Sequence, residues 1–85
     1  MTNEAFLNLC RSTVVDYFNR NVLDNNKITI DNTFIVWSCK ALQNYKALVS
    51  TDVSDGMYYE ITHNGDKKEI YVDAYKKWKN YAIKY

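Results

Sequence analysis

This chain of 85 residues has few of the residues that interrupt regular structure. It contains no proline and only two glycines, while 47% of its residues are hydrophobic. That composition excludes a collagen-like segment, a proline-rich ligand and a disordered linker. The sequence therefore predicts one folded domain over residues 1–85, with a core of modest size.

Cysteines and long apolar runs are also scarce. Two cysteines, Cys10 and Cys39, are too few for the disulfide framework that stabilises small secreted domains. The first residues lack the basic and apolar regions of a signal peptide, and no segment is long enough to span a bilayer. We expect a soluble cytoplasmic protein with reduced thiols and no membrane partner.

The single histidine, His63, limits the catalytic chemistry that can be argued. Cys39 and His63 could form a thiol nucleophile with its base, but no spacing brings them together. We expect His63 to be exposed beside Asp66, and Cys39 to be buried and structural. The cysteines and the histidine lack the spacing of zinc ligands, and no glycine-rich loop could cradle a phosphate. The expectation is a protein without catalytic residues, metal or cofactor.

Hydrophobic periodicity predicts an α+β protein. Apolar residues recur every three or four positions over residues 3–22, which is typical of an amphipathic helix. Residues rich in β-branched and aromatic side chains follow, and they favour strands. The predicted elements are a helix over 3–22, strands over 33–40, 45–51, 57–63 and 67–72, and a helix over 73–84.

The last two strands are joined by Asn64-Gly65, a pair that favours a two-residue hairpin turn. That turn sets Glu60 opposite Glu69 and Tyr58 opposite Tyr71. It also gathers the apolar side chains on one face; these are Met57, Tyr59, Ile61, Ile70 and Val72. A three-residue turn would instead pair Glu60 with Lys68, but it would scatter the apolar residues over both faces. Burial therefore favours the two-residue turn.

The predicted architecture is a two-layer sandwich with both helices on one face of a three- to four-stranded antiparallel sheet. The other face would be open, and it would carry Tyr58, Glu60, Glu69 and Tyr71. Aromatic side chains ringed by charge are typical of a protein-binding surface. The alternatives are a stabilising pair of tyrosines beside solvated acids, and a carboxylate dyad for acid–base work.

Charge is unevenly distributed along the chain. Residues 1–66 carry a net charge of −3, whereas residues 67–85 carry +4. Four lysines lie on the predicted last helix: Lys76, Lys77, Lys79 and Lys84. A helix–strands–helix order with a basic last helix is the outline of a double-stranded-RNA-binding domain. Nucleic-acid binding through these lysines is therefore the alternative function.

Two segments, residues 36–51 and 54–77, resemble a family of small proteins encoded by phages and prophages of Gram-positive bacteria such as staphylococci. The resemblance implies a non-enzymatic protein in the host bacterial cytoplasm. Its implied role is to inhibit or redirect a host protein or an anti-phage defence system. The resemblance names no target and assigns no site residues, and it leaves a homodimer open.

Overall fold

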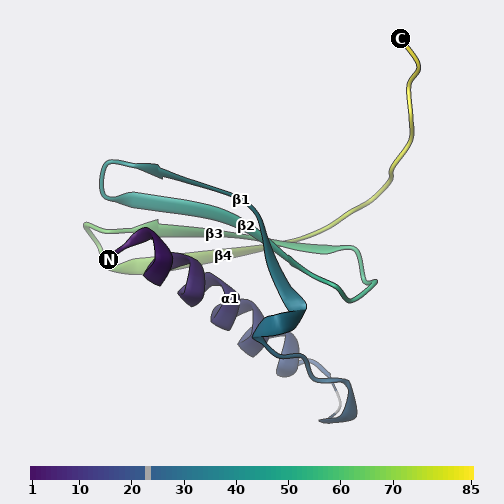
Figure 1. The fold of residues 1–85 in the computed structure, drawn as a ribbon, viewed down its shortest axis with the longest axis horizontal. Helices are drawn as coiled ribbons and strands as arrows, with labels where there is room; N and C mark the ends of the chain where they lie inside the picture. Colours follow the sequence, from purple (N-terminus) through teal and green to yellow (C-terminus); the bar gives the residue numbers. More distant parts are fainter. Residues whose placement is uncertain (23) are drawn as a thin grey trace.

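A computed structural model of the chain describes residues 1–22 and 24–85, and it shows one helix against one sheet (Figure 1). The elements in chain order are α1 (Asn3–Asn19), two short 3₁₀ turns η1 (Asp24–Asn26) and η2 (Ile30–Asn32), and the strands β1 (Thr33–Ala41), β2 (Asn44–Thr51), β3 (Met57–Asn64) and β4 (Glu69–Lys76). The α+β prediction is confirmed. No described helix is both long and apolar enough to cross a membrane.

Helix α1 begins at a side-chain cap and buries one stripe of residues. The Thr2 hydroxyl accepts a hydrogen bond from the Ala5 amide at 3.0 Å, which satisfies one of the free amides of the first turn. Phe6, Cys10 and Val14 follow at intervals of four, so they share one face of the helix, and all three are fully buried. The helix ends three residues earlier than the predicted boundary at residue 22.

The four strands form an antiparallel meander in the order β1-β2-β3-β4. Between β1 and β2 the turn is made by Leu42 and Gln43 alone, because residues 41 and 44, which the predicted strands leave in the connection, pair with each other. The register of this pair shifts between Ile35 and Trp37, so β1 contains a bulge. A bulge inserts one unpaired residue, and the side chains on its two sides then follow different alternations.

The core lies between α1 and the face of the sheet that it covers. The buried stripe of α1 packs against residues of β2 and β3: Tyr45, Ala47, Val49, Tyr59 and Ile61. Met57 and Ile70 are partly buried against this cluster. Because side chains alternate along a strand, the residues between these point to the opposite face.

The predicted pairing of β3 with β4 is wrong. Glu60 faces Asp73 and not Glu69, and Tyr58 faces Tyr75 and not Tyr71, because four residues, 65–68, form the connection. The Asn64 side-chain oxygen accepts hydrogen bonds from the amides of residues 66 and 67, each at 3.1 Å, and so stabilises this longer turn. Each strand keeps its predicted inward and outward residues.

The predicted C-terminal helix over 73–84 is also wrong. Residues 73–76 complete β4, where they pair with β3, and the Lys77 amide donates to the Gly56 carbonyl at 2.8 Å. Residues 77–85 are an extended tail that projects away from the sheet (Figure 1). Once β4 takes residues 73–76, nine residues are left, and so short a helix is unstable unless it packs on other elements. The sandwich therefore contains α1 as its only long helix among the described residues.

A candidate protein-binding face on the open side of the sheet

The sheet face opposite α1 carries most of the exposed aromatic side chains of the strands. Cross-strand pairing places its residues in three neighbouring rows. The rows are Phe34, Ser50, Tyr58 and Tyr75; Trp37, Leu48, Glu60 and Asp73; and Cys39, Lys46, Thr62 and Tyr71. We call this surface the open face. Phe34, Trp37, Tyr71 and Tyr75 are each more than 40% exposed.

The bulge in β1 brings two of these aromatic side chains to the same face. Phe34 pairs with Ser50, and Trp37 pairs with Leu48, although the two aromatic residues are three positions apart. In a regular strand, residues three apart would point to opposite faces. The extra residue of the bulge, Val36, has no partner on β2 and shifts the alternation by one position. Trp37 consequently lies beside the open-face residues of β2.

A shallow hollow of about 440 Å³ lies in the open face near the end of β4. Its lining comes from all four strands and from the start of the tail: Trp37, Leu48, Tyr58, Glu60, Tyr75, Lys76 and Lys77. Three aromatic rings and a leucine form most of the walls. Such a hollow can accept an apolar side chain of a partner, while Glu60 and the two lysines can fix the orientation of that side chain.

Carboxylates dominate the charge in the middle of the open face. Glu60 and Asp73 are directly opposed on β3 and β4. Lys46 on β2 reaches one Glu60 oxygen at 3.6 Å, so it balances one of the two charges. Directly opposed like charges destabilise a sheet by roughly a few tenths of a kcal/mol, and an exposed ion pair stabilises it by about the same amount. The predicted pair Glu60–Glu69 does not form, and Asp73 stands opposite Glu60 in its place.

Tyr71 and Glu69 form a second polar group on this face. They lie two residues apart on β4 and therefore point the same way, and the Tyr71 hydroxyl donates a hydrogen bond to Glu69 Oε2 at 2.5 Å. This hydrogen bond raises the pKa of Tyr71 above its ordinary value, with smaller contributions from desolvation and from the negative charge of Glu69. The tyrosine thus stays protonated and holds Glu69 against the sheet.

The structure places all four sequence-predicted residues on the open face but separates them into two groups. Tyr58 and Glu60 line the hollow, whereas Glu69 and Tyr71 lie toward the other end of β4. Sequence reasoning missed Trp37 and Tyr75, the two remaining aromatic walls. The helix predicted over 73–84 includes Tyr75, and the longer β4 places this residue on the open face. For Trp37 the bulge is the deciding feature, and no sequence signal marks it.

The candidate lysines do not share a helix face. Lys76 ends β4, and the other three, Lys77, Lys79 and Lys84, lie along the extended tail. The tail interleaves them with exposed aromatic residues, and Lys79 Nζ lies 5.5 Å from the ring centroid of Tyr81, within cation–π distance. The second helix on which the double-stranded-RNA-binding outline depended is absent from the described residues.

Cys39 and His63 lie on opposite faces of the sheet, so they do not form a thiol–imidazole pair. His63 is half-buried on the α1 side between the rings of Phe6 and Tyr45, with ring centroids 6.2 and 5.8 Å away. Cys39 is exposed on the open face. Both predicted environments are therefore wrong, because His63 pairs with Tyr45 on the face that α1 covers, whereas Cys39 pairs with Lys46 on the uncovered face. Within residues 1–22 and 24–85, no group of three potential metal ligands occurs.

A comparison with protein families matches residues 7–85 to a family of unknown function, DUF6275. The chain belongs to DUF6275. The match includes all four strands and most of α1. It also includes the tail, so the basic aromatic segment of this DUF6275 chain lies inside the region that defines the family. No curated protein matches the chain. No solved structure matches it either.

Proposed function

We propose that this DUF6275 chain is a non-enzymatic binding protein that holds a protein partner on the open face of its sheet. The hollow among Trp37, Tyr58 and Tyr75 is the observation that carries the proposal. Tyr58 and Tyr75 stabilise the sheet as a cross-strand pair, but that pair requires neither Trp37 nor a hollow beside it. Aromatic anchors around a hollow supply much of the binding energy of protein interfaces.

The charge of the open face supports a protein partner over a nucleic acid. Open sheets with exposed aromatic rings also bind single-stranded nucleic acid, because bases stack on the rings. Phosphates would then lie near Glu60, Glu69 and Asp73. Lys46 balances only one of these charges, and Lys76 and Lys77 lie at one end of the face. A protein partner with an apolar anchor and a cationic neighbour avoids this repulsion.

The class of partner follows from the resemblance to phage and prophage proteins. On that basis the partner is a bacterial host protein or a component of an anti-phage defence system. The chain would inhibit or redirect it in the host cytoplasm by occupying its surface. Binding alone is enough for such a role, and it requires neither a cofactor nor a catalytic residue.

Nucleic-acid binding is the second candidate, and the tail favours it. Lys77, Lys79 and Lys84 alternate with aromatic residues along an extended segment that carries no acid. This is the arrangement of a single-strand binder, in which lysines contact phosphates and rings stack on bases. It differs from the double-stranded-RNA mode because no helix presents the lysines together.

A comparative pull-down tests the proposal. Tagged wild-type chain and the variant Tyr58→Ala/Tyr75→Ala are used to capture proteins from a nuclease-treated lysate of a Gram-positive bacterium. We expect the wild type to retain a defined protein and the double variant to lose at least tenfold of it, because two anchors at 1–2 kcal/mol each exceed that factor. Tyr17→Ala is the control on the α1 side of the sheet; its ring is 44% exposed but packs edge-on against Tyr59 at 5.6 Å, so the stability of this variant is measured as well.

Circular dichroism of each variant separates loss of binding from loss of fold. Equal retention by the wild type and by the folded double variant would exclude the open face as the binding site. Retention that depends on nucleic acid, and that disappears when the three tail lysines are changed to Gln, would replace the proposal with the second candidate.

A further inference from the structure

Strand β4 has one free edge. It is the last strand of the sheet, and within the described residues it pairs only with β3. A free edge presents a row of unpaired amides and carbonyls, and it accepts another strand readily. The edge of β4 spans residues 69–76, and neither a helix nor a proline covers or interrupts it.

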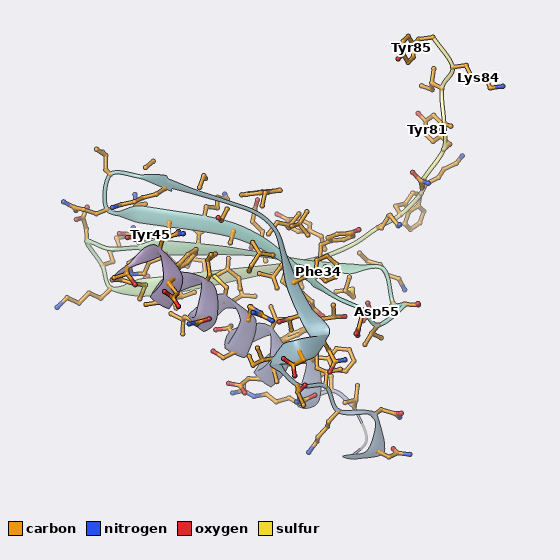
Figure 2. All side chains as sticks on the ribbon, in the orientation of Figure 1. Phe34, Tyr45, Asp55, Tyr81, Lys84 and Tyr85 are labelled. Carbon is orange, nitrogen blue, oxygen red and sulfur yellow. The ribbon has the colours of Figure 1, made fainter. Side chains whose placement is uncertain are left out.

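The tail, residues 77–85, is an extended segment without a partner strand in the described structure. Trp78, Tyr81 and Ile83 are 97%, 70% and 75% exposed, and Tyr85 is fully exposed. Figure 2 shows Tyr81, Lys84 and Tyr85 on a chain that stands clear of the sheet. Tyr81, Ile83 and Tyr85 alternate with Ala82 and Lys84, which is the period of a strand. The tail has nine residues and is therefore long enough to pair along the eight-residue edge of β4.

We propose that the tail of one copy pairs antiparallel with the free edge of β4 in a second copy, and that this exchange makes the protein a homodimer. The two segments complement each other in charge: the tail carries Lys77, Lys79 and Lys84 with no acid, and β4 carries Glu69 and Asp73. They also complement each other in apolar surface, because exposed Tyr71 and Val72 of β4 would meet the alternating side chains of the tail.

The tail reaches the β4 edge of another copy more easily than its own. It leaves the end of β4 in the outward direction (Figure 1), so pairing with its own strand requires a reversal within residues 77–80. That stretch reads Lys-Trp-Lys-Asn, without glycine or proline, and it is a poor tight turn. Between two copies no reversal is needed, and one twofold axis forms both tail–β4 pairs at once.

The dimer goes beyond the proposed function and does not depend on it. Two four-stranded sheets would join through their β4 edges, and each dimer would carry two open faces. The exchange buries the outer edge of β4 and the exposed aromatic side chains of the tail. It is therefore a property of this chain alone and can be measured without any partner.

Sedimentation velocity and zero-length crosslinking test the exchange on the full chain. At about 100 µM, which populates a dimer of micromolar Kd, we expect twice the mass of one chain. The variant Tyr81→Pro/Ile83→Pro should sediment as a monomer, because proline removes the backbone donors that pair with β4. Tyr81→Phe/Ile83→Val is the matched control and should remain dimeric.

Crosslinking of tail lysines to Glu69 or Asp73 in an equal mixture of ¹⁴N- and ¹⁵N-labelled chains identifies the pairing. We expect peptides that combine the two isotopes. A wild-type monomer at this concentration would overturn the proposal. A dimer that survives the proline variant would also overturn it, because another surface would then hold the copies together. Crosslinks confined to one isotope would overturn it by showing that the tail folds onto its own β4.

Discussion

Cys10 shows how a single buried position sets the behaviour of a residue. Cys10 lies on the buried face of α1, in the same core cluster as the ring of Tyr59, and its side chain is fully buried. Cys39 is exposed on the open face. Burial raises the pKa of Cys10 from 9.0 to about 12, because the thiolate loses its hydration, and a backbone hydrogen bond offsets only part of this. Burial, with smaller effects of Asp55 and Tyr17, also raises the pKa of Tyr59 above 10.0.

We predict that the domain loses stability as the pH rises above about 9. In the unfolded chain Cys10 and Tyr59 release their protons at their ordinary pKa values, while the folded chain retains them. The folded state then binds more protons, so the free energy of unfolding falls by about 1.4 kcal/mol per pH unit for each group in its window. Below pH 9 Cys10 and Tyr59 are largely protonated in both the folded and the unfolded chain, so neither group lowers the free energy of unfolding there. Urea unfolding between pH 7 and 11 measures the slope.

Two variants identify the groups responsible. Cys10→Ala should flatten the decline that begins near pH 9, and Tyr59→Phe should flatten the part that begins above pH 10. Each variant has a lower starting stability, but the comparison concerns the slope alone. An unchanged slope in both variants would show that neither group accounts for the alkaline loss.

At the scale of elements, the turn between β3 and β4 depends on a close approach at Gly65. A Cβ atom at this position would lie 2.6 Å from the Gln43 carbonyl oxygen in the turn between β1 and β2. The Gly65 amide also donates to the Asn44 side-chain oxygen at 3.2 Å. Glycine is therefore required by contact between two turns, and not by a positive φ. The positive φ of this loop, 55°, falls on Lys68.

We predict that Gly65→Ala destabilises the domain by on the order of 1–3 kcal/mol, because the two turns must separate to admit the methyl group. Lys68→Gly in the same loop is the matched control. Glycine adopts a positive φ without steric cost, so this variant should be neutral or slightly more stable. Urea denaturation compares the two. A Gly65→Ala variant as stable as wild type would show that the turns do not touch.

The strands and α1 could be predicted from the sequence because their side chains alternate or recur strongly. The residues that β3 and β4 direct to each face could also be predicted, although the turn between the strands is two residues longer than the predicted one. Adding two residues to the turn displaces the pairing but keeps every side chain on its face. Burial therefore identifies the face and cannot distinguish these two registers. The pairs Glu60–Asp73 and Tyr58–Tyr75 depend on the turn, where Asn64 hydrogen bonds and a lysine with positive φ decide the geometry.

The C-terminal segment shows a second limit of sequence periodicity. Trp78, Tyr81 and Tyr85 have helical spacing, but Tyr71, Asp73 and Tyr75 share the alternation of a strand. Both patterns overlap near residues 73–76, and pairing with β3 decides between them. The helical preference of residues 73–76 is weak compared with the pairing along the whole of β3 and β4, so the tertiary context overrides it. Tyr75 consequently joins the open face, which no helical assignment could have shown.

At the scale of the whole molecule, one helix is too narrow to cover four strands. Helix α1 is about 10–12 Å wide, and it lies against β1 and β2, whereas neighbouring strands are about 4.8 Å apart. Val72 on the α1 side of β4 remains 38% exposed as a result. Strand β4 is therefore poorly protected: on the α1 side Ile70 is only partly buried and Val72 is exposed, and its outer edge pairs with no strand of the described residues.

We predict that amide hydrogen exchange reports this arrangement directly. In dilute protein the β2 and β3 amides should exchange slowest, because both strands have neighbours on two sides, and the tail should exchange fastest. At about 100 µM, exchange at β4 and at the tail should slow together, since each supplies the other's hydrogen-bond partner in a second copy. Protection that appears on the open face of β1 and β2, with β4 and the tail unchanged, would place the contact between copies elsewhere.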